Sequence, residues 1–481
     1  MKPNLPRLNF REIVSRLSTL IVVHRIFVVF TIGTFISILV GSNVTNPVQQ
    51  IDAASQKTVR DMVCIAWREG EYVTEQKLAL GNGDLASTAA DPTIQLQGEP
   101  YDLSLGVVQE NVLKNNKFQE LLVSGRNAAG ISATSFASRD SAIRRGLAMS
   151  SCQPTGQNFW FSGVRTTSGF ESFLQLANPD NSDIVVSIKG FTSEGAASLA
   201  QFSRVVVPAR STRTVDLTRA LPGVEAAAFS LRVADGRIAA IVQMEVVDGV
   251  NPRGRTFIQP TVDPRNTLVI NGVSPQSTTA ELHVLPTSKD AVVTVRVVTA
   301  DGSFPLSGAE DVLIPESTVR VFDLAKALGG QGATVVVESD QPIVASLNQY
   351  VINKSVSDYE ISVGQDQVRQ LGVLAVPSIS DTTFIDVYCV GASNITLMAM
   401  KDGKKIWETT DSLSAQSFKR LKIPAELSGK TVLSIVADQP GVYVTAWTYH
   451  RTSPGSISAA TPIADVIVTS LAGARINLKA S

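Results

Sequence analysis

Two stretches of the sequence combine an arginine and an aspartate at a spacing that an enzyme could use. The first is VVVPARSTRTVDL, residues 205–217, which contains Arg213 and Asp216. The second is VLIPESTVRVFDL, residues 312–324, which carries its own arginine and Asp323 in the same register, 323 − 216 = 107 positions later. The repetition indicates either a duplicated active site or a duplicated structural element.

A third copy favours the structural interpretation. In SAQSFKRLKIPAEL, residues 414–427, Lys419 stands at the position of the arginine and Lys422 at the position of the acid. The pair is therefore not maintained, and each stretch is expected to be a strand that runs into one helical turn. Asp216 and Asp323 are predicted to be the N-caps of the first two turns. The glycines predicted to close the three turns are Gly223, Gly329 and Gly429.

Other catalytic, metal-binding or cofactor-binding signatures are missing from the sequence. The chain has three histidines, and outside the amino-terminal region only His283 and His450 remain as ligands or bases. A zinc site and a serine triad both need histidine, and neither a G-x-S-x-G elbow nor a phosphate-binding glycine loop occurs. We therefore predict no catalytic residue, no metal site, no cofactor and no enzymatic activity. A hydrolase that uses two carboxylates is the less favoured alternative.

Three aromatic residues offer one possible ligand site. Tyr443, Trp447 and Tyr449 share one parity in VYVTAWTYH, so a strand would place them on one sheet face. An exposed face of this kind could stack against sugar rings, whereas an internal one would belong to the core.

The three cysteines suggest export. Cys64 and Cys152 both precede the repeats described below, and they are the favoured disulfide pair in an oxidising compartment. Cys389 lies in the strand-like run FIDVYCV and is expected to be a small buried hydrophobic residue.

Self-similarity divides most of the chain into three repeats. Matching elements such as FSGV, residues 161–164, and INGV, residues 270–273, place the repeats at 152–266, 267–370 and 371–481, the last including a short tail. Residues 46–151 do not fit this pattern. They are predicted to be an irregular amino-terminal extracytoplasmic region, part of which could form a fourth, degenerate sandwich.

Each repeat consists of short β-branched runs separated by turn residues. Seven or eight strands in about 105 residues match an immunoglobulin-like sandwich. We therefore predict an all-β fold of three tandem immunoglobulin-like β-sandwich repeats after an amino-terminal transmembrane helix. A β-propeller with two blades per repeat is the alternative.

The amino terminus resembles a membrane anchor. Residues 1–25 are basic and form a predicted cytoplasmic tail, and residues 26–45 are free of charge and just long enough to span a bilayer. The positive flank orients the anchor, which predicts a single-pass protein of the cell membrane with its amino terminus inside and its bulk extracytoplasmic. Secretion after signal cleavage is the alternative.

The charge of the chain limits its partners. A formal net charge of −1 argues against a nucleic-acid partner. The remaining expected partners are the cytoplasmic membrane, through residues 26–45, and an envelope protein or polysaccharide.

The run RRGLAMSSCQPTGQNFWFSGV, followed by LQLANP, VVVPARSTRTVDL and ADGRIAAIV, resembles an uncharacterised family of actinobacterial secreted or membrane-anchored β-repeat proteins, a domain of unknown function. The resemblance implies an envelope location and no assigned catalytic residue. The function predicted from the whole sequence is a membrane-anchored, non-catalytic structural or interaction scaffold of the bacterial cell envelope. A carbohydrate-binding protein that uses the aromatic face is the alternative.

Overall fold

The computed structural model describes residues within Lys57–Ser481 and none of the preceding unit, Met1–Gln56. Within Lys57–Ser481 no described helix is long and apolar enough to cross a membrane. The predicted basic tail at 1–25 and the predicted anchor at 26–45 lie outside the described residues. The described residues are 59–68, 73–81, 92–114, 116–125, 128, 130–141, 144–369, 371–376, 382–427, 429–452 and 455–463.

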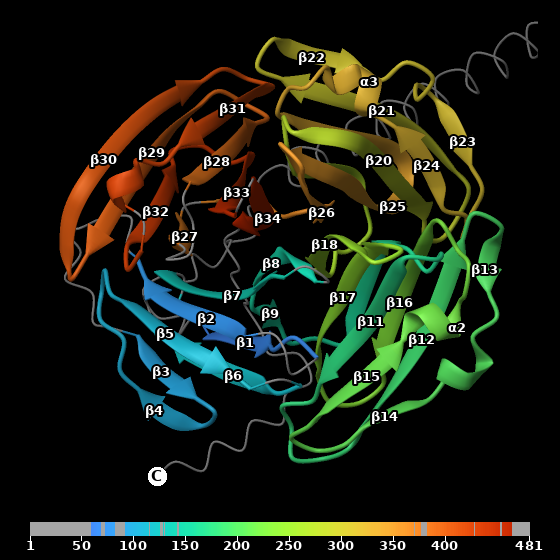
Figure 1. Ribbon diagram of the computed structural model, residues 1–481, viewed down its shortest axis with the longest axis horizontal. Helices are drawn as coiled ribbons and strands as arrows, with labels where there is room; N and C mark the ends of the chain where they lie inside the picture. The colour runs from blue at the N-terminus through green and yellow to red at the C-terminus, as the bar shows by residue number, and fades with distance from the viewer. Residues whose placement is uncertain are drawn as a thin grey trace, which may run out of the picture. The chain divides into compact units, whose positions relative to one another are not determined.

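Repeat 1 is a β-sandwich of two antiparallel layers (Figure 1). One layer has the strand order β10-β16-β12-β13, with β14 also paired to β12, and the other has the order β15-β11-β17-β18. The elements of repeat 1 are β10 (Asn158–Val164), β11 (Phe170–Ala177), β12 (Ile184–Thr192), β13 (Gly195–Ala197), η2 (Ala200–Phe202), β14 (Val205–Val207), β15 (Thr212–Asp216), α2 (Leu217–Ala220), β16 (Ala227–Val233), β17 (Ala239–Asp248) and β18 (Asn251–Ile258).

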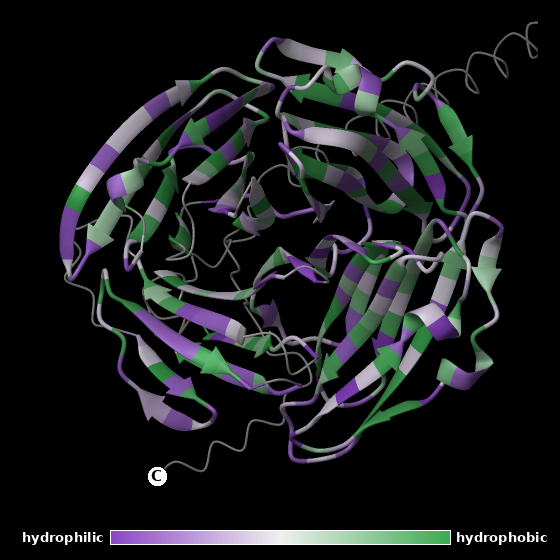
Figure 2. Cartoon of the chain, viewed as in Figure 1, coloured by the Kyte–Doolittle hydropathy of each residue, from purple (hydrophilic) through white to green (hydrophobic). Residues whose placement is uncertain are grey.

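Alternation along the strands explains why the two layers associate. On β12, Ile184, Val186 and Ile188 are buried in the core between the layers, while the residues between them are more exposed. Figure 2 shows the same alternation of apolar and polar residues on neighbouring strands. Burial of one such aliphatic side chain stabilises the fold by about 1.5–3 kcal/mol.

Repeat 2 has the same two layers, but one long strand joins them. The first half of β25 pairs with β19 and β21, and its second half pairs with β20 and β26. Strand β25 continues through Asp340-Gln341-Pro342 as it passes from one layer to the other. The elements of repeat 2 are β19 (Arg265–Val273), β20 (Ser277–Pro286), β21 (Ala291–Thr299), β22 (Gly302–Pro305), β23 (Val312–Ile314), β24 (Arg320–Asp323), α3 (Ala325–Leu328), β25 (Ala333–Asn353) and β26 (Val356–Val363).

In repeat 3 the two layers are separate sheets, as in repeat 1. The orders are β27-β32-β29-β30 and β31-β28-β33-β34, and a third apolar core lies between the two layers. The elements of repeat 3 are β27 (Leu371–Ala375), β28 (Thr382–Cys389), β29 (Ser393–Lys401), β30 (Lys404–Leu413), β31 (Ser417–Lys422), η3 (Ala425–Leu427), β32 (Val432–Ala437), β33 (Val442–Arg451) and β34 (Ser456–Ile463).

The region before the repeats is a fourth sandwich. For the described residues this corrects the prediction of an irregular region over 46–151 and agrees with the alternative that part of it forms a fourth sandwich. Its layers have the orders β4-β3-β6-β1-β9 and β5-β2-β7-β8, which match the layers of repeat 1 apart from the added β9 and the lack of a described counterpart to β14. We call it the N-terminal sandwich. Its elements are β1 (Val59–Ile65), β2 (Val73–Leu80), β3 (Thr93–Leu96), β4 (Glu99–Tyr101), β5 (Val108–Leu113), β6 (Phe118–Ser124), β7 (Ile131–Asp140), β8 (Arg145–Ser151) and β9 (Gln153–Pro154).

The prediction of an all-β fold is confirmed. In each sandwich the two layers enclose a shared core, which a propeller blade does not have. The propeller alternative is therefore wrong for the part of the chain that the structure describes.

The sandwiches contact one another by a common arrangement. The first strand of each packs on the second layer of the next: β1 on β11 and β17, β10 on β20 and β25, and β19 on β28 and β33. Strand β27 of repeat 3 packs on β2 and β7 of the N-terminal sandwich, so the series of contacts closes on itself. Ala79, Val373 and Met400 lie in the apolar cluster at this closing contact.

The last strands of the four sandwiches also meet. Strand β8 contacts β18 and β34, and β26 contacts the same two strands (Figure 1). All four sandwiches therefore share one contact region, which we call the four-strand junction.

Candidate functional site

The first of the duplicated stretches forms a structural corner. Asp216 is the N-cap of α2, and its carboxylate accepts a hydrogen bond from the backbone N–H of Arg219 at 3.0 Å. Val215 and Leu217 are buried on either side of it. The carboxylate therefore orders the turn between strand and helix.

The second stretch forms the same corner with a shift of one residue. The N-cap of α3 is Leu324, so the prediction of Asp323 at this position is wrong by one residue. The Asp323 carboxylate still accepts a hydrogen bond from the backbone N–H of Ala325 at 2.9 Å. Gly329 ends the helix in the left-handed conformation at φ 56°.

The aromatic residues of repeat 3 lie in the contact with repeat 2. Trp447 is fully buried and Tyr449 is 7% exposed, while Tyr443 is partly buried. The rings of Trp447 and Tyr449 stack at 5.7 Å, and the Tyr449 hydroxyl lies 3.0 Å from the hydroxyl of Ser274 in repeat 2. Of the two alternatives, an exposed sugar-binding face and an internal one, the structure supports the internal one, because repeat 2 covers these residues.

The contact between repeats 2 and 3 also contains a buried ion pair. The Arg420 guanidinium binds both carboxylate oxygens of Asp386 at 2.6 Å. Burial raises the pKa of Asp386, although the adjacent Arg420 opposes this shift. Asn271 of repeat 2 donates to the backbone carbonyl of Asp386 at 2.9 Å, so the same aspartate residue bonds to both repeats.

The backbones of neighbouring sandwiches approach closely in two equivalent contacts, one between β10 and repeat 2 and one between β19 and repeat 3. Gly163 on β10 and Gly272 on β19 have positive φ angles, 84° and 102°. A Cβ atom at Gly163 would lie 2.3 Å from Asn348 Oδ1, and one at Gly272 would lie 2.8 Å from Thr445 Cγ2. Glycine is required here both for the backbone conformation and for the packing of the next sandwich.

Arg237 connects the N-terminal sandwich with repeat 1. Its guanidinium contacts the carboxylates of Asp61, Glu120 and Asp180, the last two at 2.9 and 3.0 Å. Burial raises the pKa of Glu120 and of Asp180, with the nearby Arg210 acting in the opposite direction. Sequence reasoning missed this cluster, because its members come from four separate strands and loops.

His283 lies in the contact between repeats 1 and 2. It is fully buried, and neither ring nitrogen has a hydrogen-bond partner among the described residues. Burial is the main cause that lowers the pKa of His283. The neighbouring carboxylate of Glu281 is 3.9 Å from Nε2 and binds Arg165 of repeat 1 at 2.8 Å.

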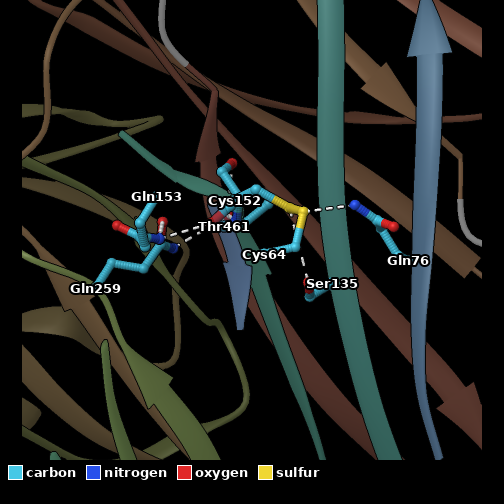
Figure 3. Close-up of a disulfide and its surroundings, with 8 residues drawn as sticks. Cys64, Gln76, Ser135, Cys152, Gln153, Gln259 and Thr461 are labelled. Atoms are coloured by element: carbon cyan, nitrogen blue, oxygen red, sulfur yellow. Dashed lines mark hydrogen bonds between the residues drawn. A yellow bond between two sulfur atoms is a disulfide. The ribbon is translucent and has the colours of Figure 1, made fainter. Parts of the chain in front are cut away.

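Cys64 and Cys152 form a disulfide inside the N-terminal sandwich (Figure 3). The Gln76 amide donates to the sulfur of Cys64 at 2.7 Å, and the Ser135 hydroxyl lies 3.7 Å from the sulfur of Cys152. Cys389 is a free, buried cysteine, and burial raises the pKa of its thiol to about 11.

The Asp358 carboxylate joins the four strands of the junction. Asp358 on β26 accepts backbone N–H groups from Leu147 and Ser458 on one oxygen and from Arg255 and Tyr359 on the other, at 2.9–3.0 Å. These four donors belong to β8, β34, β18 and β26, one strand from each sandwich. Burial raises the pKa of Asp358 to about 7 against the opposing effect of the four hydrogen bonds.

A cavity of about 310 Å³ lies beside the junction and is lined by residues of all four sandwiches. Its polar side chains already bond to one another: Gln259 accepts from Gln153 and donates to Thr461 (Figure 3). Gln365 donates to the backbone carbonyl of Val444. These contacts tie the sandwiches together, and no group of three or more metal-ligating side chains occurs among the described residues.

Comparison with known proteins gives a family but no activity. No curated protein matches the chain. A solved structure described as a tetra-tandem repeat in the extending region of a large adhesion protein has 11% sequence identity, covers 81% of this chain and 99% of its own, and has a TM-score of 0.11, which is too low to support an argument. A family of unknown function, DUF5719, matches residues 107–424, and the chain therefore belongs to this family.

Proposed function

We propose that the protein is a membrane-anchored structural or interaction scaffold of the bacterial cell envelope and that it has no catalytic role. Residues 26–45 anchor it in the cytoplasmic membrane, and the sandwiches lie on the extracytoplasmic side. The cysteine usage and the basic flank of the anchor support this orientation.

The observation that carries the proposal is the shared use of Asp358 by all four sandwiches. A carboxylate with four backbone donors from four sandwiches fixes their relative positions, since any displacement would leave buried N–H groups without a partner. A scaffold needs such a fixed body on which to hold its partners.

The positions of the side chains that could take part in catalysis or ligand binding further support the scaffold proposal. His283, Trp447 and the Asp386–Arg420 pair all lie in contacts between sandwiches. Their position in these contacts supports a role in assembly.

The location is tested by protease treatment of intact cells and spheroplasts that carry the full chain. We expect the sandwiches to be degraded in spheroplasts, while a variant that lacks residues 26–45 is no longer recovered with the membrane. Protection of the wild-type sandwiches in spheroplasts would place them in the cytoplasm and contradict the proposal.

The scaffold role is tested by photo-crosslinking in intact cells. A photoreactive residue replaces Leu313, which is 63% exposed, or Val112, which is 69% exposed. Replacement of Leu347, which is fully buried, is the matched control. Recurrent crosslinks to the same envelope component from the exposed positions alone are expected, and the absence of crosslinks from both exposed positions would overturn the role.

A further inference from the structure

Repeat 1 is open on one side, between the edge strands of its two layers. A cavity of about 640 Å³ lies between β14 and β15, which are the strands of the stretch VVVPARSTRTVDL. The apolar part of its lining includes Phe202, Val205, Val215 and Ala220. Phe202 and Ala220 are only partly buried, so an apolar surface remains accessible from solvent.

Three arginines surround this apolar surface. Arg204, Arg213 and Arg219 line the cavity and all are exposed. Asp216 is the one carboxylate of the lining; it binds Arg219 at 3.2 Å and also caps α2. Within the described part of the chain, Arg204 and Arg213 have no carboxylate partner.

Repeat 2 has the same corner and keeps a base at two of the three positions, Arg320 for Arg213 and Lys326 for Arg219, but its charge differs at the position of Arg204. At the spacing of 107 residues, Asp311 stands at the position of Arg204 and Ala309 at that of Phe202. Asp311 is engaged with the hydroxyl of Thr294 at 3.2 Å, and Ala309 is buried. The fold of the corner therefore requires neither Arg204 nor Phe202.

We infer that the open side of repeat 1 binds a sugar that carries a carboxylate or phosphate group, with Arg204 and Arg213 as the anion-binding residues. Guanidinium groups form paired hydrogen bonds with either anion. The ring of Phe202 and the adjacent aliphatic side chains provide a surface for the apolar face of a sugar ring. This inference rests on the proposed function, because it assigns the chemistry of one partner of the scaffold.

The test is isothermal titration of the detergent-solubilised full chain with glucuronate, glucose 6-phosphate and uncharged glucose. We expect saturable binding of at least one acidic sugar and none of glucose, and the two acidic sugars identify the preferred anion. Arg204→Ala together with Arg213→Ala is expected to weaken this binding at least tenfold. Arg320→Ala, at the position of Arg213 in repeat 2, is the matched control and should leave it unchanged.

Binding that persists in the double variant, equal binding of glucose, or no binding of any of the three sugars would overturn the inference. Circular dichroism of the double variant establishes that a loss of binding does not come from unfolding. If the chain forms envelope crosslinks but binds no sugar, the sugar site is refuted and the scaffold role stands. If it binds a sugar but forms no envelope crosslinks, the scaffold role is refuted and the sugar site stands.

Discussion

Asp358 accepts a hydrogen bond from the backbone N–H of Leu147 at 2.9 Å, across 211 residues of sequence. Leu147 belongs to the N-terminal sandwich and Asp358 to repeat 2, which do not follow each other in the chain. Three further N–H groups complete the site, so this one side chain links all four sandwiches.

Replacement of this carboxylate should destabilise the whole body. Asp358→Ala leaves four buried donors without an acceptor, and we expect the free energy of unfolding to fall by about 3 kcal/mol or more. Asp358→Asn keeps one accepting oxygen and should have an intermediate effect. Urea unfolding followed by tryptophan fluorescence measures both.

The control for this experiment is Asp402→Asn at an exposed turn, where a change within about 0.5 kcal/mol is expected. Equal urea midpoints for Asp358→Ala and Asp402→Asn would show that the junction does not depend on the carboxylate.

Stability should also depend on pH through Asp358. Its pKa rises from 3.8 to about 7 on folding, so between these values the folded chain retains a proton that the unfolded chain has released. The contribution of this group to the free energy of unfolding is therefore greatest below pH 4, decreases as the pH rises to 7 and is constant above, with a slope of at most about 1.4 kcal/mol per pH unit.

The pH dependence is measured as the difference in unfolding free energy between wild type and Asp358→Asn across pH 4 to 8. A difference that does not vary with pH would contradict the raised pKa.

The sequence predicts the local structure of the repeats well. Alternation gives strands such as β12, and the spacing of 107 residues identifies the corners at Asp216 and Asp323. The single-residue shift at the second corner was not predictable, since Asp323 can cap from either of two adjacent positions.

The contacts between sandwiches are harder to predict. The partners of Asp358 are backbone N–H groups, which every residue except proline has, so they leave no pattern in the sequence. The parity of Tyr443, Trp447 and Tyr449 identifies their common face but not the repeat that covers it. The N-terminal sandwich could be predicted only as an alternative, because it shares strand order with the repeats without sharing their motifs.

The glycines at the equivalent contacts give a third prediction. Gly163→Ala adds a Cβ atom where Asn348 Oδ1 would be 2.3 Å away. We expect a loss of about 1–2 kcal/mol from the positive φ angle and a further 1–3 kcal/mol from overpacking. Thermal unfolding of the purified variant measures the sum.

Gly308→Ala separates the two effects, because Gly308 has a similar φ of 78° and a Cβ atom added there would have no other atom within 4 Å. Gly308→Ala should therefore lose only about 1–2 kcal/mol, the part that comes from the positive φ angle. Equal losses at the two glycines would mean that β10 does not pack tightly on repeat 2.

The disulfide gives the last prediction. Cys64 and Cys152 are 88 residues apart, and in the chain-entropy model the bond destabilises the unfolded chain by about 4.6 kcal/mol. Dithiothreitol should therefore lower the urea midpoint of the wild type, and Cys64→Ala with Cys152→Ala should reproduce the reduced state without responding to the reductant. Cys389→Ala is the matched control: it loses buried contacts, yet its response to dithiothreitol should equal that of the wild type. A wild-type midpoint that does not move on complete reduction, with free thiols counted by mass spectrometry after alkylation, would show that the sandwich derives no stability from the bond.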